Sequence, residues 1–250
     1  MIRYFFIIFI FNISLLPADP QQLRVEIIST LPHDPKAYTQ GLVIVGDDLY
    51  ESTGQYGESS IRKIDPNTGK ILEKYDLPPQ FFGEGIAYVN GKLIQLTWRE
   101  YVVFVYDLNP IRLVKKIPFE GEGWGLSADG TALLMTNGTS FILKRNPASL
   151  AIEKKTNVKN LTRLNDLAVV KNELYANVWM SDNIYKINKN SGQVTAIIDA
   201  SRLLTSEERK NLSIDSVLNG IAYRSKTDTF FITGKYWPHL YEVRFVGSHE

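Results

Sequence analysis

Cysteine is absent from the 250 residues of this chain. Disulfide bonds, thiol nucleophiles and thiolate metal sites are therefore excluded. Histidine is scarce, and none of His33, His239 and His249 forms a metal-ligand spacing with a neighbour. The sequence also lacks a glycine-rich phosphate loop and a Gly-x-Ser-x-Gly nucleophile elbow. The fold must be held by its hydrophobic core, which a chain of this size can supply.

An excess of charge of either sign is missing too. The chain has 28 Lys and Arg residues against 27 Asp and Glu residues. This balance excludes the electrostatic footprint of a protein that binds nucleic acid or an anionic membrane. Hydrophobic residues at 44% and charged residues at 22% are ordinary for a globular protein, and closed all-β folds of this length form single domains.

The N-terminus carries the one long apolar run. In residues 1–18, Arg3 precedes an apolar stretch of the length of a signal-peptide core, which is shorter than the roughly 20 residues that span a bilayer. We interpret residues 1–18 as an export signal and residues 19–250 as one domain. The alternative is an uncleaved membrane anchor, because Leu16-Pro17-Ala18 is a poor cleavage site. Either way we expect a periplasmic or secreted protein.

A short phrase recurs along the chain: a polar or aromatic residue, usually Gly, then Leu or Ile before an apolar strand. Its five copies begin at Gln40, Glu84, Trp124, Asn165 and Asn219, and the fourth has Asp166 in place of Gly. The copies recur at intervals of about 40 to 54 residues, close to the roughly 40–50 of propeller repeats, whose units are four-stranded blades. The sequence predicts an all-β, five-bladed β-propeller.

Turn signals within the units agree with four-stranded blades. Inner hairpins are predicted at residues 46–48, 90–92, 129–130 and 171–173, and outer hairpins at 65–69 and 188–192. The last unit supplies only about three strands, so we expect Leu23 to Ser29 to be its fourth strand and to close the ring. The long fourth interval predicts a surface helix in residues 200–212.

The first residues of the repeated phrase are candidates for a binding pocket, because equivalent positions of successive blades form a ring around one end of the channel. The same spacing separates Glu84 from Trp98 and Asn165 from Trp179, so three tryptophans map to this end. Aromatic walls with a few polar groups are typical of a small-ligand pocket. A core role for each tryptophan remains the alternative.

Two charged residues are candidates for chemistry. Glu84, beside Phe81 and Phe82, can exchange protons near neutrality if its aromatic surroundings raise its pKa. Lys235 lies beside the ring and can hold a carbonyl or a developing negative charge. A solvated loop acid and a surface lysine are the ordinary alternatives. Calcium binding by Asp47, Asp48 and Glu51 is conceivable, with turn solvation as the more ordinary role.

Seven phrases, in order along residues 25–245, resemble the plant-type glutaminyl cyclases. They are Tyr-Thr-Gln-Gly-Leu (38–42), Phe-Gly-Glu-Gly (82–85), Gly-Trp-Gly-Leu (123–126), Arg-Leu-Asn-Asp-Leu (163–167), Ala-Asn-Val-Trp (176–179), Val-Leu-Asn-Gly-Ile-Ala (217–222) and Thr-Gly-Lys-Tyr-Trp-Pro (233–238). That family is a five-bladed propeller that converts the N-terminal glutamine of peptides to pyroglutamate with loss of ammonia. One departure is Tyr38, where the family often has Phe.

The resemblance implies roles for individual residues. Glu84 is the expected acid/base group, and Asn165 and Lys235 complete the expected catalytic set. The residues expected to bind substrate are Gln40, Tyr38, Phe82, Trp98, Trp124, Trp179 and Asn219. The implied partners are peptides with N-terminal glutamine, and we expect a monomer that needs no metal or other cofactor, with a structural calcium ion left open.

The sequence is also compatible with two other functions. A propeller that binds a peptide or a glycan without catalysis would use the same pocket, because a fold does not fix a function. A propeller that hydrolyses lactones would need a metal site in the channel. Glu84 is the only acid among the five first-position residues and none of them is His, which argues against that site.

Overall fold

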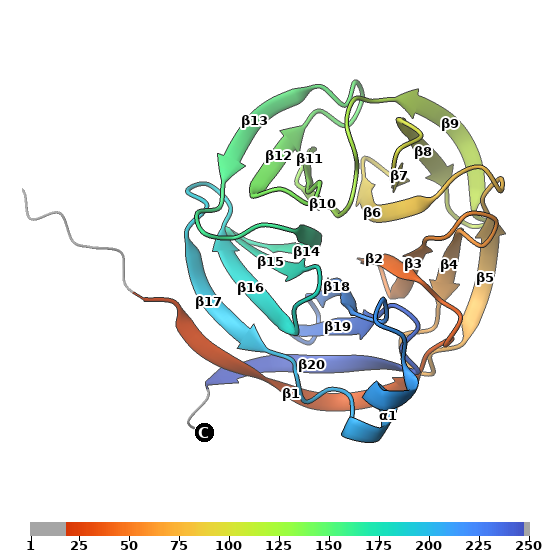
Figure 1. Ribbon diagram of the computed structural model, residues 1–250. Helices are drawn as coiled ribbons and strands as arrows, with labels where there is room; N and C mark the ends of the chain where they lie inside the picture. Colours follow the sequence, from red (N-terminus) through yellow and green to blue (C-terminus); the bar gives the residue numbers. More distant parts are fainter. Residues whose placement is uncertain (1–18, 248–250) are drawn as a thin grey trace, which may run out of the picture.

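The structure, a computed structural model, describes residues 19–247, so the predicted export signal in residues 1–18 lies outside it. Strands form nearly all of its regular structure. They gather into small twisted sheets around a central axis, in a propeller-like arrangement (Figure 1). In the described part of the chain, no helix is both long and apolar enough to cross a membrane.

Three sheets each contain four consecutive antiparallel strands. The first is β2 (Thr39–Val45), β3 (Asp48–Thr53), β4 (Ser60–Ile64) and β5 (Ile71–Asp76). The second is β6 (Gly83–Val89), β7 (Lys92–Thr97), β8 (Val102–Asp107) and β9 (Arg112–Pro118). The third is β10 (Leu126–Asp129), β11 (Ala132–Met135), β12 (Phe141–Arg145) and β13 (Ile152–Asn157). Connections are short because consecutive antiparallel strands need only a hairpin between them.

The remaining strands form one eight-stranded sheet. Its spatial order is β14 (Leu164–Val170), β15 (Glu173–Val178), β16 (Asn183–Asn188), β17 (Val194–Asp199), β1 (Gln21–Pro32), β20 (His239–Gly247), β19 (Thr229–Gly234) and β18 (Leu218–Arg224). β1 runs parallel to β17 and antiparallel to β20. The predicted strand Leu23 to Ser29 lies within β1. Its predicted pairing with the last repeat unit is confirmed by β20, whereas the pairing with β17 was not predicted.

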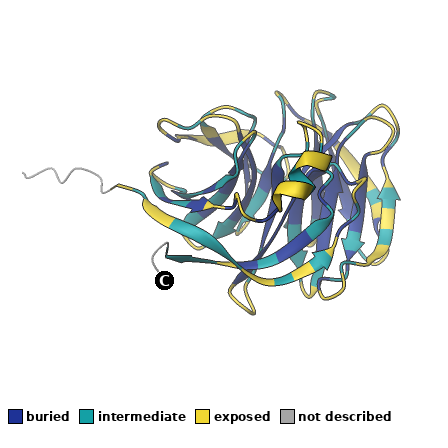
Figure 2. Ribbon diagram, turned by 60° about the horizontal axis from the view of Figure 1, so that its bottom comes forward, coloured by how far each residue is buried: buried dark blue, intermediate teal, exposed yellow. Residues whose placement is uncertain are grey.

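The innermost strands lie around the axis. β2, β6, β10, β14 and β18 contact one another in that order, and β18 contacts β2 again, which closes the cycle. Burial falls from the axis outward, because the inner strands pack between neighbouring sheets while outer strands such as β5 and β13 face solvent (Figure 2). The predicted hairpins lie where the sequence placed them: Gly46, Gly91 and Gly130 adopt positive φ in inner turns, and Gly69 and Gly192 do so in outer turns.

The predicted helix is shorter than expected. Only Ser206–Asn211 form α1, and none of its residues is buried. Thr205 caps its first turn in a capping box with Glu208, so the helix cannot begin earlier. Leu203 and Leu204 are buried, but they pack in the turn that precedes the helix.

Candidate active site

One end of the central axis opens into a pocket of about 530 Å³. Its walls come from residues at the start of inner strands and from the loops that follow β3, β7, β15 and β19. The lining residues are Tyr38, Gln40, Gln55, Tyr56, Phe82, Glu84, Trp98, Arg99, Trp124, Asn165, Trp179 and Lys235. The structure thus brings together every predicted site residue except Asn219.

Asn219 is fully buried beneath the pocket and does not line it. Its side-chain amide donates to the Thr39 carbonyl at 3.0 Å and to Gln40 Oε1 at 3.4 Å. Asn219 lies at the predicted position of the repeat, but its side chain points between the inner strands and not toward the opening of the pocket. The geometry therefore gives it contact with Gln40 instead of the direct substrate contact that the sequence predicted.

Glu84 lies on β6 between two glycines that allow neighbouring strands to approach closely. A Cβ on Gly83 would meet the Thr53 carbonyl oxygen at 2.6 Å, and one on Gly85 would meet the backbone nitrogen of Leu126 at 2.5 Å. Glu84 is 4% exposed, and within residues 19–247 its carboxyl group has no hydrogen-bond partner. The carboxyl group is therefore free to meet a substrate.

The surroundings of Glu84 favour its protonated form. Burial raises the pKa of this carboxyl well above its ordinary value, because an ionised group loses its hydration there. Lys235 opposes the shift, while the negative charges of Glu100 and Glu122 add to it. A carboxyl group whose pKa is raised in this way is suited to accept and to return a proton, as a general acid or base must.

Lys235 faces the same pocket from the turn after β19. It is 4% exposed, and its Nζ lies 4.3 Å from the centroid of the Tyr38 ring. Burial lowers the pKa of Lys235 to about 8, against the opposing effect of Glu84. In the described structure no ion pair joins Lys235 to Glu84, although each affects the pKa of the other. A polar group of a substrate can therefore lie between them.

Two amide side chains supply further polar atoms. Asn165 Oδ1 is buried without a hydrogen-bond partner among the described residues. The backbone of Asn165 is held by Thr136, whose hydroxyl donates to the Asn165 carbonyl at 2.7 Å. Gln40 receives Asn219 on its Oε1, and its Nε2 makes no hydrogen bond within residues 19–247. A buried polar group without a partner is costly, so Asn165 Oδ1 is suited to accept a hydrogen bond from a ligand.

The aromatic wall consists of two groups of rings. Phe82 contacts Tyr38, Tyr56 and Trp98 at centroid distances of 6.0, 5.4 and 5.5 Å. Trp124 contacts Trp179 at 6.0 Å. No ring contact between described residues joins the two groups.

A carboxylate that the sequence analysis missed bridges this gap. Glu122 Oε2 accepts the indole N–H of Trp98 at 3.1 Å and that of Trp124 at 3.3 Å. Its Oε1 accepts Arg99 Nε at 2.9 Å. Glu122 and Arg99 lie outside the repeated phrase, and the sequence did not predict them. Tyr56 and Gln55 also line the pocket and were not predicted. The one signal was the position of Glu122 two residues before Trp124.

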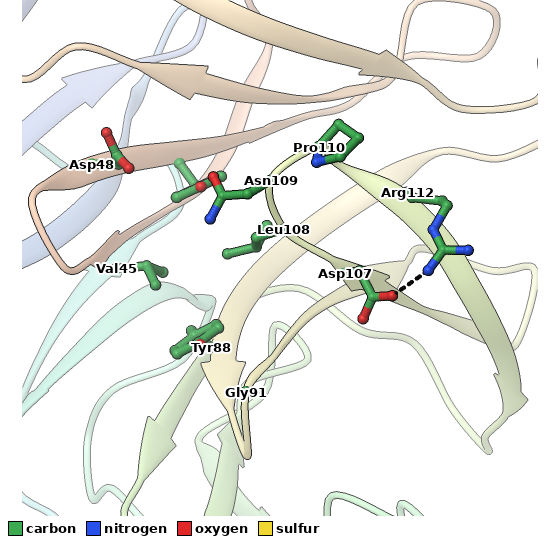
Figure 3. A pocket seen from close by; sticks show the side chains of 10 residues that line it. Val45, Asp48, Tyr88, Gly91, Asp107, Leu108, Asn109, Pro110 and Arg112 are labelled. Carbon is green, nitrogen blue, oxygen red and sulfur yellow. Dashed lines mark hydrogen bonds and ion pairs between the residues drawn. The ribbon is translucent and has the colours of Figure 1, made fainter.

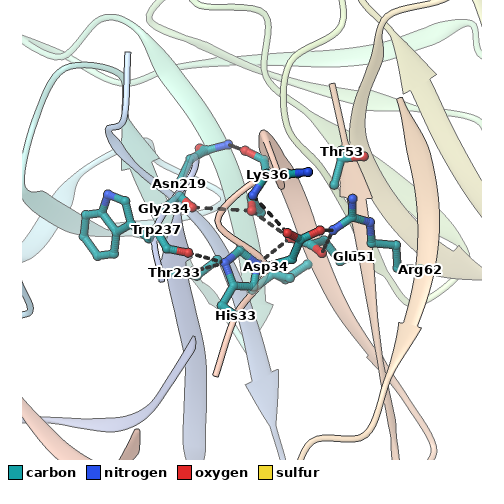
Figure 4. A network of polar contacts seen from close by, with 12 residues as sticks. His33, Asp34, Lys36, Glu51, Thr53, Arg62, Asn219, Thr233, Gly234 and Trp237 are labelled. Atoms are coloured by element: carbon teal, nitrogen blue, oxygen red, sulfur yellow. Dashed lines mark hydrogen bonds and ion pairs between the residues drawn. The ribbon is translucent and has the colours of Figure 1, made fainter. Parts of the chain in front are cut away.

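A second missed cluster lies where β1 meets the first sheet (Figure 4). His33 Nε2 contacts Glu51 Oε1 at 2.8 Å, and the Thr39 hydroxyl donates to the same oxygen at 2.7 Å. Burial alone would lower the pKa of His33, but Glu51 raises it above its ordinary value. This buried cluster fixes Thr39, the residue before Gln40, and so supports one wall of the pocket.

The candidate calcium ligands do not converge. Asp47 pairs with Lys226 and Asp48 with Lys63, while Glu51 is buried against His33 instead of solvating a turn. No group of three or more His, Cys, Asp or Glu residues that could hold a metal ion occurs in residues 19–247. A separate cavity of about 330 Å³ lies between the first two sheets and is edged by the Asp107–Arg112 ion pair (Figure 3). Asp48 lines this cavity, but none of the predicted catalytic or substrate-binding residues does.

Comparisons with known proteins agree on one family. The sequence model of the glutamine cyclotransferase family matches residues 9–245. A glutaminyl-peptide cyclotransferase of Arabidopsis thaliana is 40% identical over 231 residues, which cover 88% of this chain and 71% of the plant protein. The crystal structure of Myxococcus xanthus glutaminyl cyclase is similar with a TM-score of 0.85 and 31% identity, and the match covers 91% of this chain and 99% of that one.

Proposed function

Because the chain belongs to the glutamine cyclotransferase family, we propose that it converts the N-terminal glutamine of peptides to pyroglutamate and releases ammonia. The observation that carries the mechanism is Glu84, a buried carboxyl group without a hydrogen-bond partner among described residues, in a pocket walled by aromatic rings. The two reacting groups, an amine and a carboxamide, belong to one residue. The protein therefore has to hold them close together and to move protons.

The reaction forms one bond and breaks one. The α-amine nitrogen attacks the carbon of the side-chain carboxamide, and Glu84 takes a proton from that nitrogen. Negative charge develops on the amide oxygen, where Lys235 in its charged form stabilises it. Glu84 then gives its proton to the departing nitrogen, which leaves as ammonia while the five-membered lactam ring closes. No covalent intermediate with the protein is needed.

The other pocket residues orient the substrate. Asn165 Oδ1 lacks a partner among the described residues and can accept an N–H of the substrate, while Gln40 Nε2 can donate to a carbonyl. Trp98, Trp124 and Trp179 enclose the glutamine side chain and limit the access of water. Asn219 acts through Gln40, as a positioning residue.

The first experiment measures ammonia release from a glutamine-initiated peptide by purified residues 19–250, with and without a strong chelator. We expect release that the chelator does not reduce, because the proposed proton transfer and charge stabilisation are performed by Glu84 and Lys235. Glu84→Gln should lower kcat at least about a hundredfold, the usual contribution of general acid–base catalysis. It should retain the fold. Release by the variant at the wild-type rate would refute the role of Glu84, and loss with the chelator would refute the metal-independent mechanism.

We also propose that the ring has five blades, with the last one made of β18, β19, β20 and β1. The support is that β2, β6, β10, β14 and β18 form a closed cycle of contacts. These five strands also line the opening at the other end of the axis, through residues that include Leu42, Tyr88, Ser127, Leu167 and Ile221. On this interpretation the eight-stranded sheet is two blades that meet edge to edge at β1 and β17.

We further propose that the protein is exported and that it is a monomer. We infer that residues 1–18 direct the protein out of the cytoplasm, with retention as an anchor as the alternative. N-terminal sequencing of the exported protein distinguishes cleavage from retention. The proposed monomer is tested by light scattering of residues 19–250 at micromolar concentration.

A further inference from the structure

One exposed cation lies at the mouth of the pocket. Three charged residues line the pocket, namely Glu84, Arg99 and Lys235. Glu84 and Lys235 are buried, whereas the side chain of Arg99 is 56% exposed. A peptide whose first residue occupies the inner part of the pocket must pass this mouth with its second residue. Arg99 is therefore the charged lining group that the second residue meets.

Arg99 is held in a defined orientation. Its Cζ lies 3.8 Å from the centroid of the Trp98 ring, and its Nε donates to Glu122 Oε1 at 2.9 Å. Glu122 is itself fixed by the indole N–H groups of Trp98 and Trp124. These hydrogen bonds keep the pKa of Glu122 below its ordinary value against the opposite effect of burial, so its charge persists at neutral pH.

The other edge of the guanidinium group is unused. In residues 19–247, Arg99 Nη1 and Nη2 donate no hydrogen bond. Nearby Glu100 is engaged elsewhere, since it accepts the Tyr56 hydroxyl at 2.7 Å and the Phe82 amide at 3.4 Å. Guanidinium N–H groups in a fixed fork match the two oxygens of a carboxylate. Because Arg99 is already ordered, little additional entropy is lost when it binds one.

We propose that Arg99 is a subsite for a carboxylate on the residue that follows the N-terminal glutamine. The inference rests on the proposed function, because that function places the glutamine beside Glu84. The carboxylate is either the terminal one of a dipeptide or the side chain of Asp or Glu at the second position. Arg99 already has one anionic partner and is partly screened by solvent, so the expected preference is about two- to fivefold.

The test uses two pairs of substrates that differ in one charge. Gln-Ala is compared with its C-terminal amide, and Gln-Asp amide is compared with Gln-Asn amide. In wild-type protein, kcat/KM should favour the carboxylate of at least one pair by about two- to fivefold, mainly through KM. Arg99→Ala should bring the ratio close to one, and Arg99→Lys should keep part of it, because a lysine retains the charge and loses the fork.

The matched control is Arg112→Ala. Arg112 is also an exposed arginine paired with an acid, at 2.7 Å from Asp107, but it lines the separate cavity between the first two sheets. This variant has the same loss of charge and should keep the wild-type ratios. A preference in only one pair identifies the terminal or the side-chain carboxylate as the ligand.

Ratios near one in wild-type protein, or wild-type ratios in Arg99→Ala, would overturn the subsite. If wild-type protein releases ammonia from none of the four peptides, the proposed function fails. The subsite is then tested by measuring the affinity for the same peptides from the change in tryptophan fluorescence. Tighter binding of the carboxylate peptides that is lost in Arg99→Ala supports the subsite. Equal binding within each pair overturns it.

Discussion

Two buried carboxyl groups near the axis differ in their surroundings. Glu84 has no hydrogen-bond partner in the described structure, which suits a group that meets substrate. Asp166 accepts the backbone N–H of Leu42 at 3.2 Å and that of Ile221 at 2.8 Å, and so connects three inner strands. It stands where the other repeats have glycine, and burial raises its pKa to about 8.

The raised pKa of Asp166 makes stability depend on pH. Between its ordinary pKa of 3.8 and about 8, the folded state binds the proton more tightly than the unfolded state. The free energy of unfolding therefore falls as pH rises through this window, and becomes flat above it. Asp166→Asn resembles the protonated form, so the total fall in the free energy of unfolding across this window should be smaller by at least about 1 kcal/mol. Urea unfolding at several pH values measures this, and equal slopes in the two proteins would contradict it.

Glu122 should affect substrate binding through the tryptophans that it holds. Glu122→Ala removes the acceptor shared by Trp98 and Trp124, so we expect KM for Gln-Ala amide to rise about tenfold, with a smaller change in kcat. Glu122→Gln retains a carbonyl oxygen and should restore most of the loss. Glu120→Gln, an exposed residue on the same loop, is the control. A change in stability with unchanged KM would show a purely structural role.

The repeat shows in the sequence which residues can surround the pocket, and this explains why Glu84, Trp98, Trp124 and Trp179 were found. It does not show which way a side chain turns, and Asn219 lies at the expected position but points between strands. Glu122 lies outside the repeated phrase, and its partners come from two different loops. Such a contact follows from the packing of neighbouring sheets, which a single sequence does not reveal.

At the scale of elements, the junction between β1 and β3 is built around a buried ion pair. His33 follows β1, Glu51 lies on β3, and the His33 ring also contacts the Trp237 carbonyl at 2.7 Å. These residues are distant in sequence from Trp237, so the cluster exists only when the ring is closed. The sequence suggested no role for His33, because tertiary structure brings its partners together from distant parts of the chain.

His33→Ala should destabilise the protein by about 3 kcal/mol, because it leaves the buried carboxylate of Glu51 without its histidine. The pKa of His33 is raised, so its contribution is full below its ordinary value of 6.5 and is lost as pH rises through the folded value. Urea unfolding at pH 6 and pH 9 measures both effects. His239→Ala removes a partly exposed histidine and should cost less. Equal losses in the two variants would argue against the buried pair.

At the scale of the whole molecule, β1 pairs the first described residues with the last described strand. Its residues Leu23 and Val25 pack on the core beside the last strands, and its backbone pairs with both β17 and β20. The repeat in the sequence counts units but says nothing about hydrogen bonds between their edges. This is why five units were expected while the strands group into three small sheets and one sheet of eight.

Removal of β1 should prevent the ring from closing. A protein that begins at residue 33 would expose the edges of β17 and β20, and such edges promote aggregation. Residues 19–250 should unfold in one transition, with the same midpoint by far-UV circular dichroism and tryptophan fluorescence. The shortened protein should lack this transition and elute as aggregates. A folded, active monomer without β1 would show that closure is dispensable.

The pairing of β1 with β20 also places the two ends of the ring together, since Leu23 lies opposite Gly247. A short linker could join them, and new ends could be opened in the exposed turn between β4 and β5. In such a circular permutant each inner strand would keep its neighbours. The pocket would then form from the same side chains, whichever unit leaves the ribosome first.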